Sequence, residues 1–348
     1  MAKNPGELKT GSQGEMLYNR VKKRYRHLKK WAKRTGTDVL RLYDRDIPEI
    51  PLVLDLYGDA VSGALYKRPY EKDPAEEAAW LNVMTGAISD ALEIPRERVF
   101  LKYREHQRGN TQYRRLGRQN FVRDIHEGAL TFRVNLSDYL DTGFFPDRRR
   151  MRSRIRSEAA GKTLLNLFCY TGAFSVCAAA GGAAAVDSVD MSRSYLEWAA
   201  VNFGLNHFTA LPVPPELLTA RKHPRSRGDP YRLIRADALR FLDAALTAGL
   251  SWDIIILDPP AFSNSKKMTA TLDIKRDHKT LISQCLSLLK AGGKLWFSVN
   301  VRSFHLDPGE FPEWEITNLS ALMEDEDFRG KKPPLCYTFT RPSYGITL

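Results

Sequence analysis

The segment from Leu164 to Met191 constrains the fold of this chain more than any other. It reads LLNLFCYTGAFSVCAAAGGAAAVDSVDM: an apolar run, a short polar turn, a small-residue stretch, a glycine pair and a second apolar run that ends in an acid. Short apolar runs bounded by turn residues are typical of buried parallel strands, and the stretch between them is long enough for two helical turns. We therefore predict strands at 164–168 and 184–189, with a helix at 174–180 between them.

The turn after the first of these strands predicts a nucleoside site. Tyr170-Thr171-Gly172 lets a ligand lie against backbone N–H groups, and Asp190, at the end of the second strand, can accept hydrogen bonds from both ribose hydroxyls. Because Gly172 is the only glycine in the turn, the dinucleotide pattern GxGxxG is missing and a pyrophosphate fits poorly. S-adenosyl-L-methionine is the common nucleoside ligand without phosphates. An ordinary crossover, with Asp190 capping a helix that starts near Ser192, is the alternative.

Strands and helices keep alternating to the end of the chain. Further strands are predicted at 231–234, 252–257, 294–299 and 335–340, and helices at 193–206 and 272–289. This order is typical of a Rossmann-like, doubly wound parallel sheet in the α/β class, whose ligands bind beyond the carboxyl ends of the strands. Asp190, Asp237 and Asp258 each fall at such an end. We expect Asp190 at the ribose, Asp237 at the adenine amino group and Asp258 near the transferred methyl group, and no metal site.

The sequence DPPAF, from Asp258 to Phe262, is the second specific feature. Two prolines stiffen the loop after a buried strand and direct Phe262 toward the cleft, where an aromatic ring can stack on a flipped base. A rigid turn with Phe262 in the core is the alternative. Lys266 and Lys267 follow and are candidates for phosphate contacts. The loop has no cysteine, which disfavours covalent methylation at pyrimidine carbon five.

The charge of the chain favours a polyanionic partner. Its 53 lysines and arginines face 41 acids, which gives a net charge of +12. Residues 20–34 form a predicted amphipathic basic helix without acids, after a segment 1–14 that is expected to be frayed. Lys22, Lys23, Lys29 and Lys30 of this helix are candidate phosphate contacts, although a solvated helix face would look the same.

Two negative observations bear on the compartment. No apolar run approaches the roughly 20 residues that span a membrane, and no signal peptide opens the chain, so we expect a cytoplasmic protein with no membrane contact. The four cysteines lack CxxC spacing and are expected to be reduced core residues.

Two domains are expected, with a boundary near residues 125–135. Residues 1–130 would hold the basic helix and a small α+β RNA-binding domain, and residues 131–348 the methyltransferase domain. In the first domain, strands are predicted at 38–43, 52–57, 63–66 and 99–103 and a helix at 74–94. After a strand at 130–136, an arginine-rich helix at 148–156 is expected to present a basic surface.

Five segments together resemble a known family. They are NLSDYLDTGFFPDRR (135–149), NLFCYTGAFSV (166–176), VDMSRSYLEWA (189–199), DPPAFSNSKKM (258–268) and KRDH (275–278). They are similar to the guanine-N7 methyltransferase half of the bacterial RlmKL family, which acts on 23S ribosomal RNA, and the similarity begins near Tyr18. The guanine-N2 methyltransferase half and its THUMP domain have no counterpart in this sequence. The resemblance therefore implies a free-standing RlmK-like enzyme, with a separate guanine-N2 methyltransferase as a candidate partner.

The resemblance also implies site residues. Contacts to S-adenosyl-L-methionine are expected at the segment before the arginine-rich helix, at the central turn and beside the strand-end acids: Asp147, Arg149, Asn166, Phe168, Tyr170, Thr171, Gly172, Asp190, Met191, Ser192, Asp237, Ala238 and Asp258. Two features depart from the family pattern. Pro146 replaces the usual leucine, and residues 207–230 form a longer, basic connection.

The expected product is 7-methylguanine in 23S ribosomal RNA or in a precursor of the large subunit. Guanine N7 carries an in-plane lone pair, so no general base is required; Asp258 and Phe262 are the candidate catalytic residues, and His278 is read as structural. Guanine-N2 or cytosine-C5 methylation is the alternative activity. A non-catalytic rRNA-binding assembly factor would carry the same basic segments.

Overall fold

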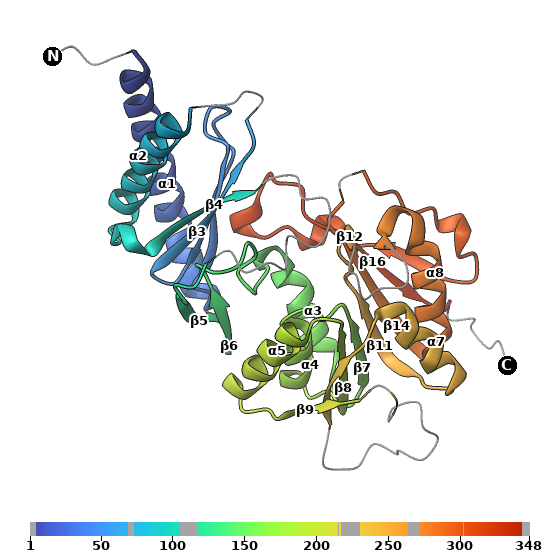
Figure 1. Ribbon diagram of the computed structural model, residues 1–348. Helices are drawn as coiled ribbons and strands as arrows, with labels where there is room; N and C mark the ends of the chain where they lie inside the picture. Colours follow the sequence, from blue (N-terminus) through green and yellow to red (C-terminus); the bar gives the residue numbers. More distant parts are fainter. Residues whose placement is uncertain are drawn as a thin grey trace. The chain divides into compact units, whose positions relative to one another are not determined.

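The computed structural model describes residues 5–68, 73–104, 117–214, 216, 230–263, 272–301 and 303–342. The chain divides into two compact units, Met1–Pro146 and Asp147–Leu348 (Figure 1). The first unit includes the hairpin of β5 (Val122–Glu127) and β6 (Leu130–Asn135) and the segment after it. The hairpin is joined to the rest of the unit by a bridge between Thr37 and Glu127 and by a hydrogen bond from His126 N to Asp38 Oδ1. Thr142 Oγ1 donates to Tyr57 Oη over 2.9 Å, and Lys102 Nζ donates to the carbonyl oxygen of Tyr139.

The first unit is a four-stranded sheet with two helices on one face. Its strands follow the order β1-β2-β3-β4, antiparallel except for the parallel pair β3 and β4, which α2 connects. The elements are α1 (Pro5–Thr35), β1 (Val39–Asp44), β2 (Leu52–Tyr57), β3 (Ala60–Tyr66), α2 (Pro74–Leu92), the 3₁₀ turn η1 (Arg96–Arg98) and β4 (Val99–Arg104). The strands and helix expected here all form, with ends shifted by a few residues.

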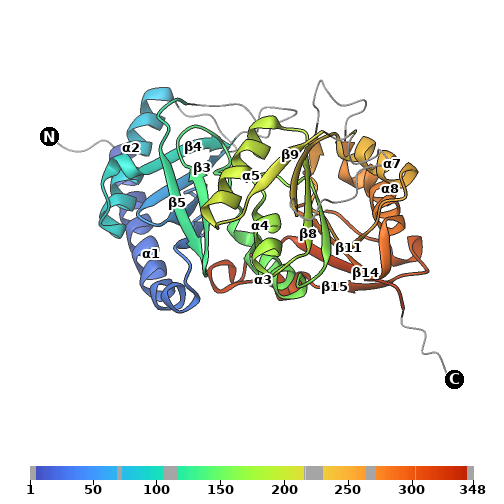
Figure 2. The ribbon, with the colours of Figure 1, turned by 90° about the horizontal axis from the view of Figure 1, so that it is seen from below.

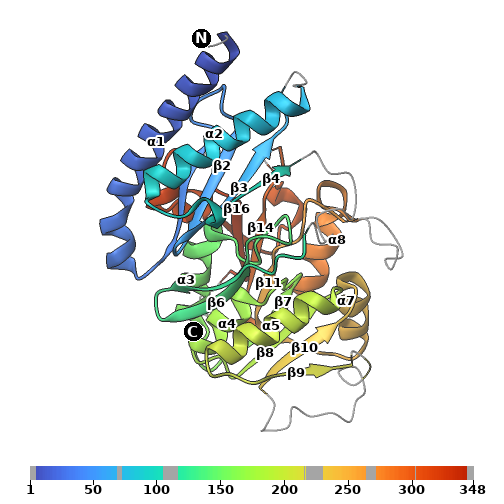
Figure 3. The ribbon, with the colours of Figure 1, turned by 60° about the vertical axis from the view of Figure 1, so that its left-hand side comes forward.

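Helices α1 and α2 lie side by side on this sheet (Figure 3). Apolar side chains at helical spacing on α1, including Leu17, Val21 and Leu28, are fully buried in the core of this unit. For residues 5–14, the described part of the segment 1–14 that was expected to be frayed, the expectation is wrong, because they belong to α1. Gln13 accepts a 2.6 Å hydrogen bond from Trp80 of α2, and a Cβ at Gly14 would lie 2.7 Å from Val83, so α1 is packed against α2 at residues 13 and 14.

The second unit is the expected doubly wound sheet. Its strand order is β15-β16-β14-β11-β7-β8-β10-β9; the six strands from β14 to β9 are parallel, whereas β16 and β15 extend the sheet in antiparallel pairs. The strands are β7 (Thr163–Leu167), β8 (Ala185–Asp190), β9 (Ala210–Val213), β10 (Tyr231–Arg235), β11 (Trp252–Leu257), β14 (Leu289–Val299), β15 (Glu315–Asn318) and β16 (Leu335–Thr340). The helices are α3 (Arg149–Glu158), α4 (Ala173–Ala180), α5 (Arg193–Leu205), α7 (Ala238–Thr247) and α8 (Ile274–Ser287).

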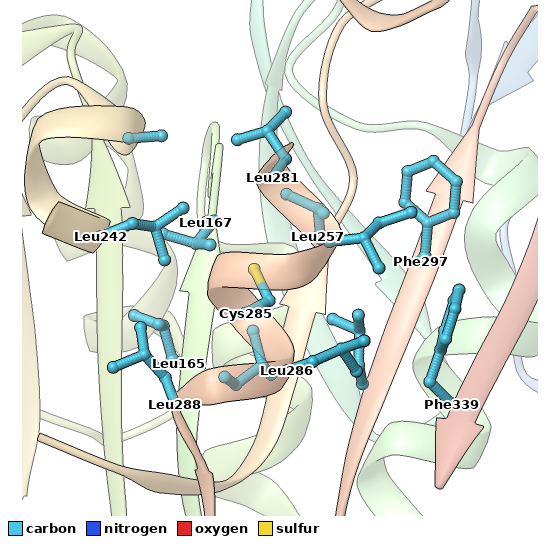
Figure 4. Close-up of a cluster of buried hydrophobic side chains, with 14 of the residues drawn as sticks. Leu165, Leu167, Leu242, Leu257, Leu281, Cys285, Leu286, Leu288, Phe297 and Phe339 are labelled. Atoms are coloured by element: carbon cyan, nitrogen blue, oxygen red, sulfur yellow. The ribbon is translucent and has the colours of Figure 1, made fainter. Parts of the chain in front are cut away.

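Alternate residues of the central strands serve the two faces of this sheet. Ile254 and Ile256 of β11 pack in a cluster with residues of α3 and α4. Figure 2 shows these two helices on one side of the sheet and α7 and α8 on the other. Ile255 and Leu257 pack on the opposite side with α7 and α8, whose Leu242, Leu281 and Cys285 are drawn in Figure 4. The sheet is thus buried on both faces, which explains the continuous apolar runs in the sequence.

The glycine pair Gly292-Gly293 lies within a strand. Helix α8 ends at Ser287, and Gly292 and Gly293 lie inside β14, not at the end of the helix. The pairing of β14 with β11 slips there, from Leu289 opposite Trp252 to Lys294 opposite Ile254. A Cβ at Gly293 would lie 2.9 Å from the carbonyl oxygen of Lys290, so the pair forms a bulge that only small residues permit.

All four cysteines are free and buried. Within the described ranges, no helix is long and apolar enough to cross a membrane. The same ranges contain no group of three or more His, Cys, Asp or Glu side chains placed to hold a metal ion.

Candidate cofactor and substrate site

The turn between β7 and α4 has an unusual backbone. Phe168 and Tyr170 adopt positive φ angles of 55° and 52°, and Gly172 follows with 75°. Left-handed backbone at a non-glycine residue costs on the order of 1–3 kcal/mol and collects at binding sites. Hydrogen bonds hold the turn: Cys169 N donates to Val189 O over 3.0 Å, and Gly172 N donates to Cys169 O over 2.8 Å. The turn is therefore fixed before any ligand arrives.

Asp190 lies at the end of β8 and borders this turn. Its Oδ2 accepts from Tyr170 N over 3.0 Å, and its Oδ1 accepts from Ser192 N over 2.8 Å. Burial raises the pKa of Asp190 to about 6, although the backbone N–H groups of Ser192, Tyr170 and Met191 act in the opposite direction. The N-cap of α5 is Ser192, whose Oγ accepts from Tyr195 N, so Asp190 is not the helix cap of the alternative reading.

A buried polar network supports the turn from below. Asn166 Nδ2 donates to Ser175 Oγ over 2.9 Å, and Ser188 Oγ donates to the same hydroxyl over 2.7 Å. The Thr171 carbonyl oxygen accepts from Asn202 Nδ2 over 2.8 Å. Asn166 Oδ1 is buried and has no hydrogen-bond partner among the described residues. A buried acceptor without a donor is costly, which is consistent with a ligand that supplies one.

Gly172 gives the sharpest test of the turn. A Cβ there would lie 2.9 Å from the Cβ of Ala199 on α5, and φ is positive, so Gly172→Ala adds a clash to a backbone penalty of about 1–2 kcal/mol. We expect a lower melting temperature and weaker S-adenosylhomocysteine binding by calorimetry. The double variant G172A/A199G should recover only the part due to the clash. Equal stability of G172A and the native chain would contradict this geometry.

The other two strand-end acids lie at the same carboxyl edge. Asp237 follows β10, the neighbour of β8, and its Oδ1 accepts from Arg240 N over 3.1 Å as the N-cap of α7, which begins at the buried Ala238. Asp258 follows β11 on the opposite side of β7. Their placement around the turn agrees with the sequence analysis, whereas their roles toward ligands stay predictions.

Asp258 has a partner that the sequence analysis missed. Arg148 Nε and Nη2 donate to its two carboxylate oxygens over 3.1 and 2.9 Å, and Arg148 is only 8% exposed. Arg148 Nη1 also donates to Asp147 Oδ2 over 3.2 Å. Asp147 Oδ1 is buried and, among the described residues, has no hydrogen-bond partner. Asp147 and Asp258 therefore meet at one guanidinium group at the start of α3.

Arg149 turns out to be part of an internal ion cluster. Its guanidinium donates to Asp325 over 3.1 Å and to Asp327 over 2.9 Å, and all three side chains are buried. Arg152 is buried as well, so the arginine-rich helix is less of a basic surface than its composition indicates. A contact of Arg149 with the cofactor stays a prediction.

Phe262 is not a core residue. Phe262 is 41% exposed. It lies in a two-residue strand, β12 (Phe262–Ser263), that pairs with β13 (Leu272–Asp273). Lys266 and Lys267 lie outside the described residues. His278 packs its ring against Phe304, and its Nδ1 lies 3.0 Å from the Lys275 carbonyl oxygen, which agrees with a structural role.

These features fit S-adenosylmethionine. The turn contains only one glycine, Gly172, and so lacks the GxGxxG pattern that binds a pyrophosphate. Asp190 presents a carboxylate at the strand end, and two buried oxygens, on Asn166 and Asp147, lack donors among the described residues. The doubly wound sheet and this set of side chains define a class I S-adenosylmethionine-dependent methyltransferase.

Comparisons with known proteins agree. A profile of the S-adenosylmethionine-dependent methyltransferase family matches residues 51–311. The chain is 41% identical over 325 residues to ribosomal RNA large subunit methyltransferase K of Neisseria meningitidis, covering 93% of this chain and 87% of that protein. It is 43% identical to the K/L protein of Stutzerimonas stutzeri, covering 91% of this chain but 41% of that protein. The chain therefore belongs to the ribosomal RNA large subunit methyltransferase K family.

A solved structure supports the fold alone. A methyltransferase complexed with S-adenosylhomocysteine superimposes with a TM-score of 0.68 at 24% identity, covering 94% of this chain and 81% of that one. The cofactor of the family is S-adenosylmethionine, as expected from the turn.

Proposed function

We propose that this protein transfers a methyl group to guanine N7 in 23S ribosomal RNA, or in a precursor of the large subunit, in the cytoplasm. The named relatives act on large-subunit ribosomal RNA according to their names, which supports the substrate. The observation that carries the choice of N7 is the ion pair between Arg148 and Asp258. A separate guanine-N2 methyltransferase is the candidate partner.

The ion pair matters because the two candidate reactions need different groups. An exocyclic amine such as guanine N2 has to lose a proton, and an acceptor at the strand end assists that reaction. In Asp258 each oxygen already accepts from Arg148, and the guanidinium cancels its charge. Guanine N7 has an in-plane lone pair and loses no proton. A site with a neutralised carboxylate is therefore better suited to N7.

The residues of this chain then have definable tasks. S-adenosylmethionine supplies an electrophilic methyl group on a sulfonium. Asp190 would hold the ribose hydroxyls, the backbone of Phe168 to Gly172 would line the nucleoside, and Asp237 would accept from the adenine amino group. Exposed Phe262 would stack on the extruded guanine and hold N7 in line with the methyl group. Catalysis would then consist of aligning guanine N7 with the methyl group.

A methyl-transfer assay in vitro tests the proposal. Purified protein, S-adenosylmethionine and 23S ribosomal RNA that lacks the modification should yield 7-methylguanosine in a nucleoside digest, while 16S ribosomal RNA serves as the control. Formation of N2-methylguanosine or 5-methylcytidine would replace the proposed reaction by one of the alternatives. Binding of RNA without any transfer would favour the assembly factor.

Helix α1 supports the RNA assignment. Lys23 and Lys30 are exposed, and no ion pair with an acid is found for either among the described residues. Lys22 and Lys29 lie over the rings of Tyr18 and Tyr25 at 4.7 and 5.8 Å from the ring centroids, so their stems cover the helix surface. We propose that all four of these lysines contact RNA phosphates. Lys266 and Lys267 would contact phosphates near the substrate base.

A pair of double variants tests this surface. K23Q/K30Q should weaken RNA binding and lower the slope of log Kd against log salt by about 0.7 for each lost contact. The control K162Q/K332Q removes the same charge from two exposed lysines of the other unit and should leave the slope unchanged. Single-turnover methylation at saturating RNA should stay near that of the native chain in both. Equal slopes for the two variants would show that α1 is a solvated face.

A further inference from the structure

We propose that Arg148 is a positioning residue that clamps Asp258 and so sets the position of Phe262 against the substrate base. The inference rests on the proposed function for the identity of that base, and it gives a task to a residue outside the predicted site. The clamp consists of Nε and Nη2 on the two oxygens of Asp258. A two-pronged contact fixes the plane of the carboxylate as well as its distance.

The loop after Asp258 transmits this constraint. Pro259 and Pro260 lock two consecutive φ angles, so few torsions separate the clamped carboxylate from Ala261 and Phe262. The far end is held too: Ile274 N donates to Ala261 O over 3.3 Å, and Phe262 pairs with Asp273 in the short sheet of β12 and β13. Exposed Phe262 is therefore fixed from both sides. Loss of the clamp should release the end of the loop at Asp258.

The same guanidinium reaches the expected cofactor segment. Arg148 Nη1 donates to Asp147 Oδ2, and Asp147 keeps a buried Oδ1 with no partner in the described part of the chain. One side chain thus joins the residue implied at the cofactor to the residue that begins the substrate loop. A lysine cannot replace it, because an ammonium group lacks the planar fork that serves both carboxylates. The guanidinium geometry, and not its charge alone, is the functional feature.

Kinetics separate positioning from charge. We expect R148A to lower kcat for total methyl transfer to ribosomal RNA about 100-fold at saturating S-adenosylmethionine, the effect of a misplacement near 1 Å. R148K should stay at least about tenfold below the native kcat. In a double-mutant cycle, R148A/D258A should be no slower than the worse single variant. Full activity of R148K, or multiplied losses in the double variant, would overturn the proposal.

A measurement without RNA keeps the inference distinct from the proposed function. Amide hydrogen exchange at Ala261 and Phe262 should be faster in R148A than in the native chain, and unchanged in the control R154A, which alters an exposed arginine of the same helix. If R148A does not fold, R148K, which keeps a positive charge beside Asp147 and Asp258, gives the same comparison. Native protein that methylates no ribosomal RNA would refute the proposed function; unaltered exchange in the Arg148 variants would refute the clamp.

Discussion

Asp190→Ala is expected to lower the affinity for S-adenosylmethionine by at least about 100-fold. Two charge-assisted hydrogen bonds to ribose hydroxyls are together worth roughly 3–6 kcal/mol, and the same carboxylate holds the N–H groups of Tyr170 and Ser192 in the turn. Isothermal calorimetry with S-adenosylhomocysteine measures the loss directly. An unchanged Kd would remove Asp190 from the site.

The pH dependence gives the same prediction a second readout. Burial places the pKa of Asp190 at about 6, and the ribose requires the charged form as acceptor. Affinity should therefore be constant above about pH 7 and fall as the pH drops through 6, approaching tenfold for each unit below it. Asp190→Asn binds weakly and should show no such slope, because its side chain does not titrate. A flat profile for the native chain would contradict the assignment.

Asp187→Ala is expected to be among the most destabilising substitutions in the second unit. Asp187 is fully buried, accepts from Arg232 Nε and Nη2 over 2.6 and 2.9 Å, and also accepts from Trp252 Nε1 over 2.8 Å. Its removal leaves a guanidinium and an indole N–H without acceptors, a cost of about 3–5 kcal/mol in the free energy of unfolding. Thermal unfolding should show a fall of roughly 10 °C.

A pair of similar geometry at the surface is the control. Arg133 donates to Asp124 over 2.8 and 2.9 Å, but the two side chains are 38% and 36% exposed. Asp124→Ala should change the free energy of unfolding by at most about 1 kcal/mol, since water replaces the carboxylate. Equal losses in the two variants would mean that burial of the Asp187 pair has no energetic consequence.

The segment from β7 to β8 could be predicted because the sequence features that specify it are close together in the chain. Apolar runs, Gly172 and the acid at position 190 lie within one continuous segment, and their spacing alone specifies strand, turn and helix. The class of the sheet and the cofactor followed from that segment. Short edge strands such as β9 and β15 were missed, because four residues with little burial carry no periodic pattern.

The contacts that complete the site are not local. Arg148 and Asp258 are 110 residues apart in the chain, and Arg148 stands in a run of arginines whose composition indicates solvent exposure. Arg148 and Arg149 are buried against acids from other segments, Asp258 for the first and Asp325 and Asp327 for the second, and the run of arginines itself does not predict these partners. A run of basic residues gives the number of positive charges, but tertiary contacts determine which of them are exposed to solvent.

Nucleoside mass spectrometry of isolated 23S ribosomal RNA is the most direct test of the central claim. The RNA should come from a strain that lacks this protein and from the same strain supplied with the native chain or with D190A. The account predicts that 7-methylguanosine is lost from the deletion strain, returns with the native chain and does not return with D190A. An unchanged level of 7-methylguanosine in the deletion strain would contradict it.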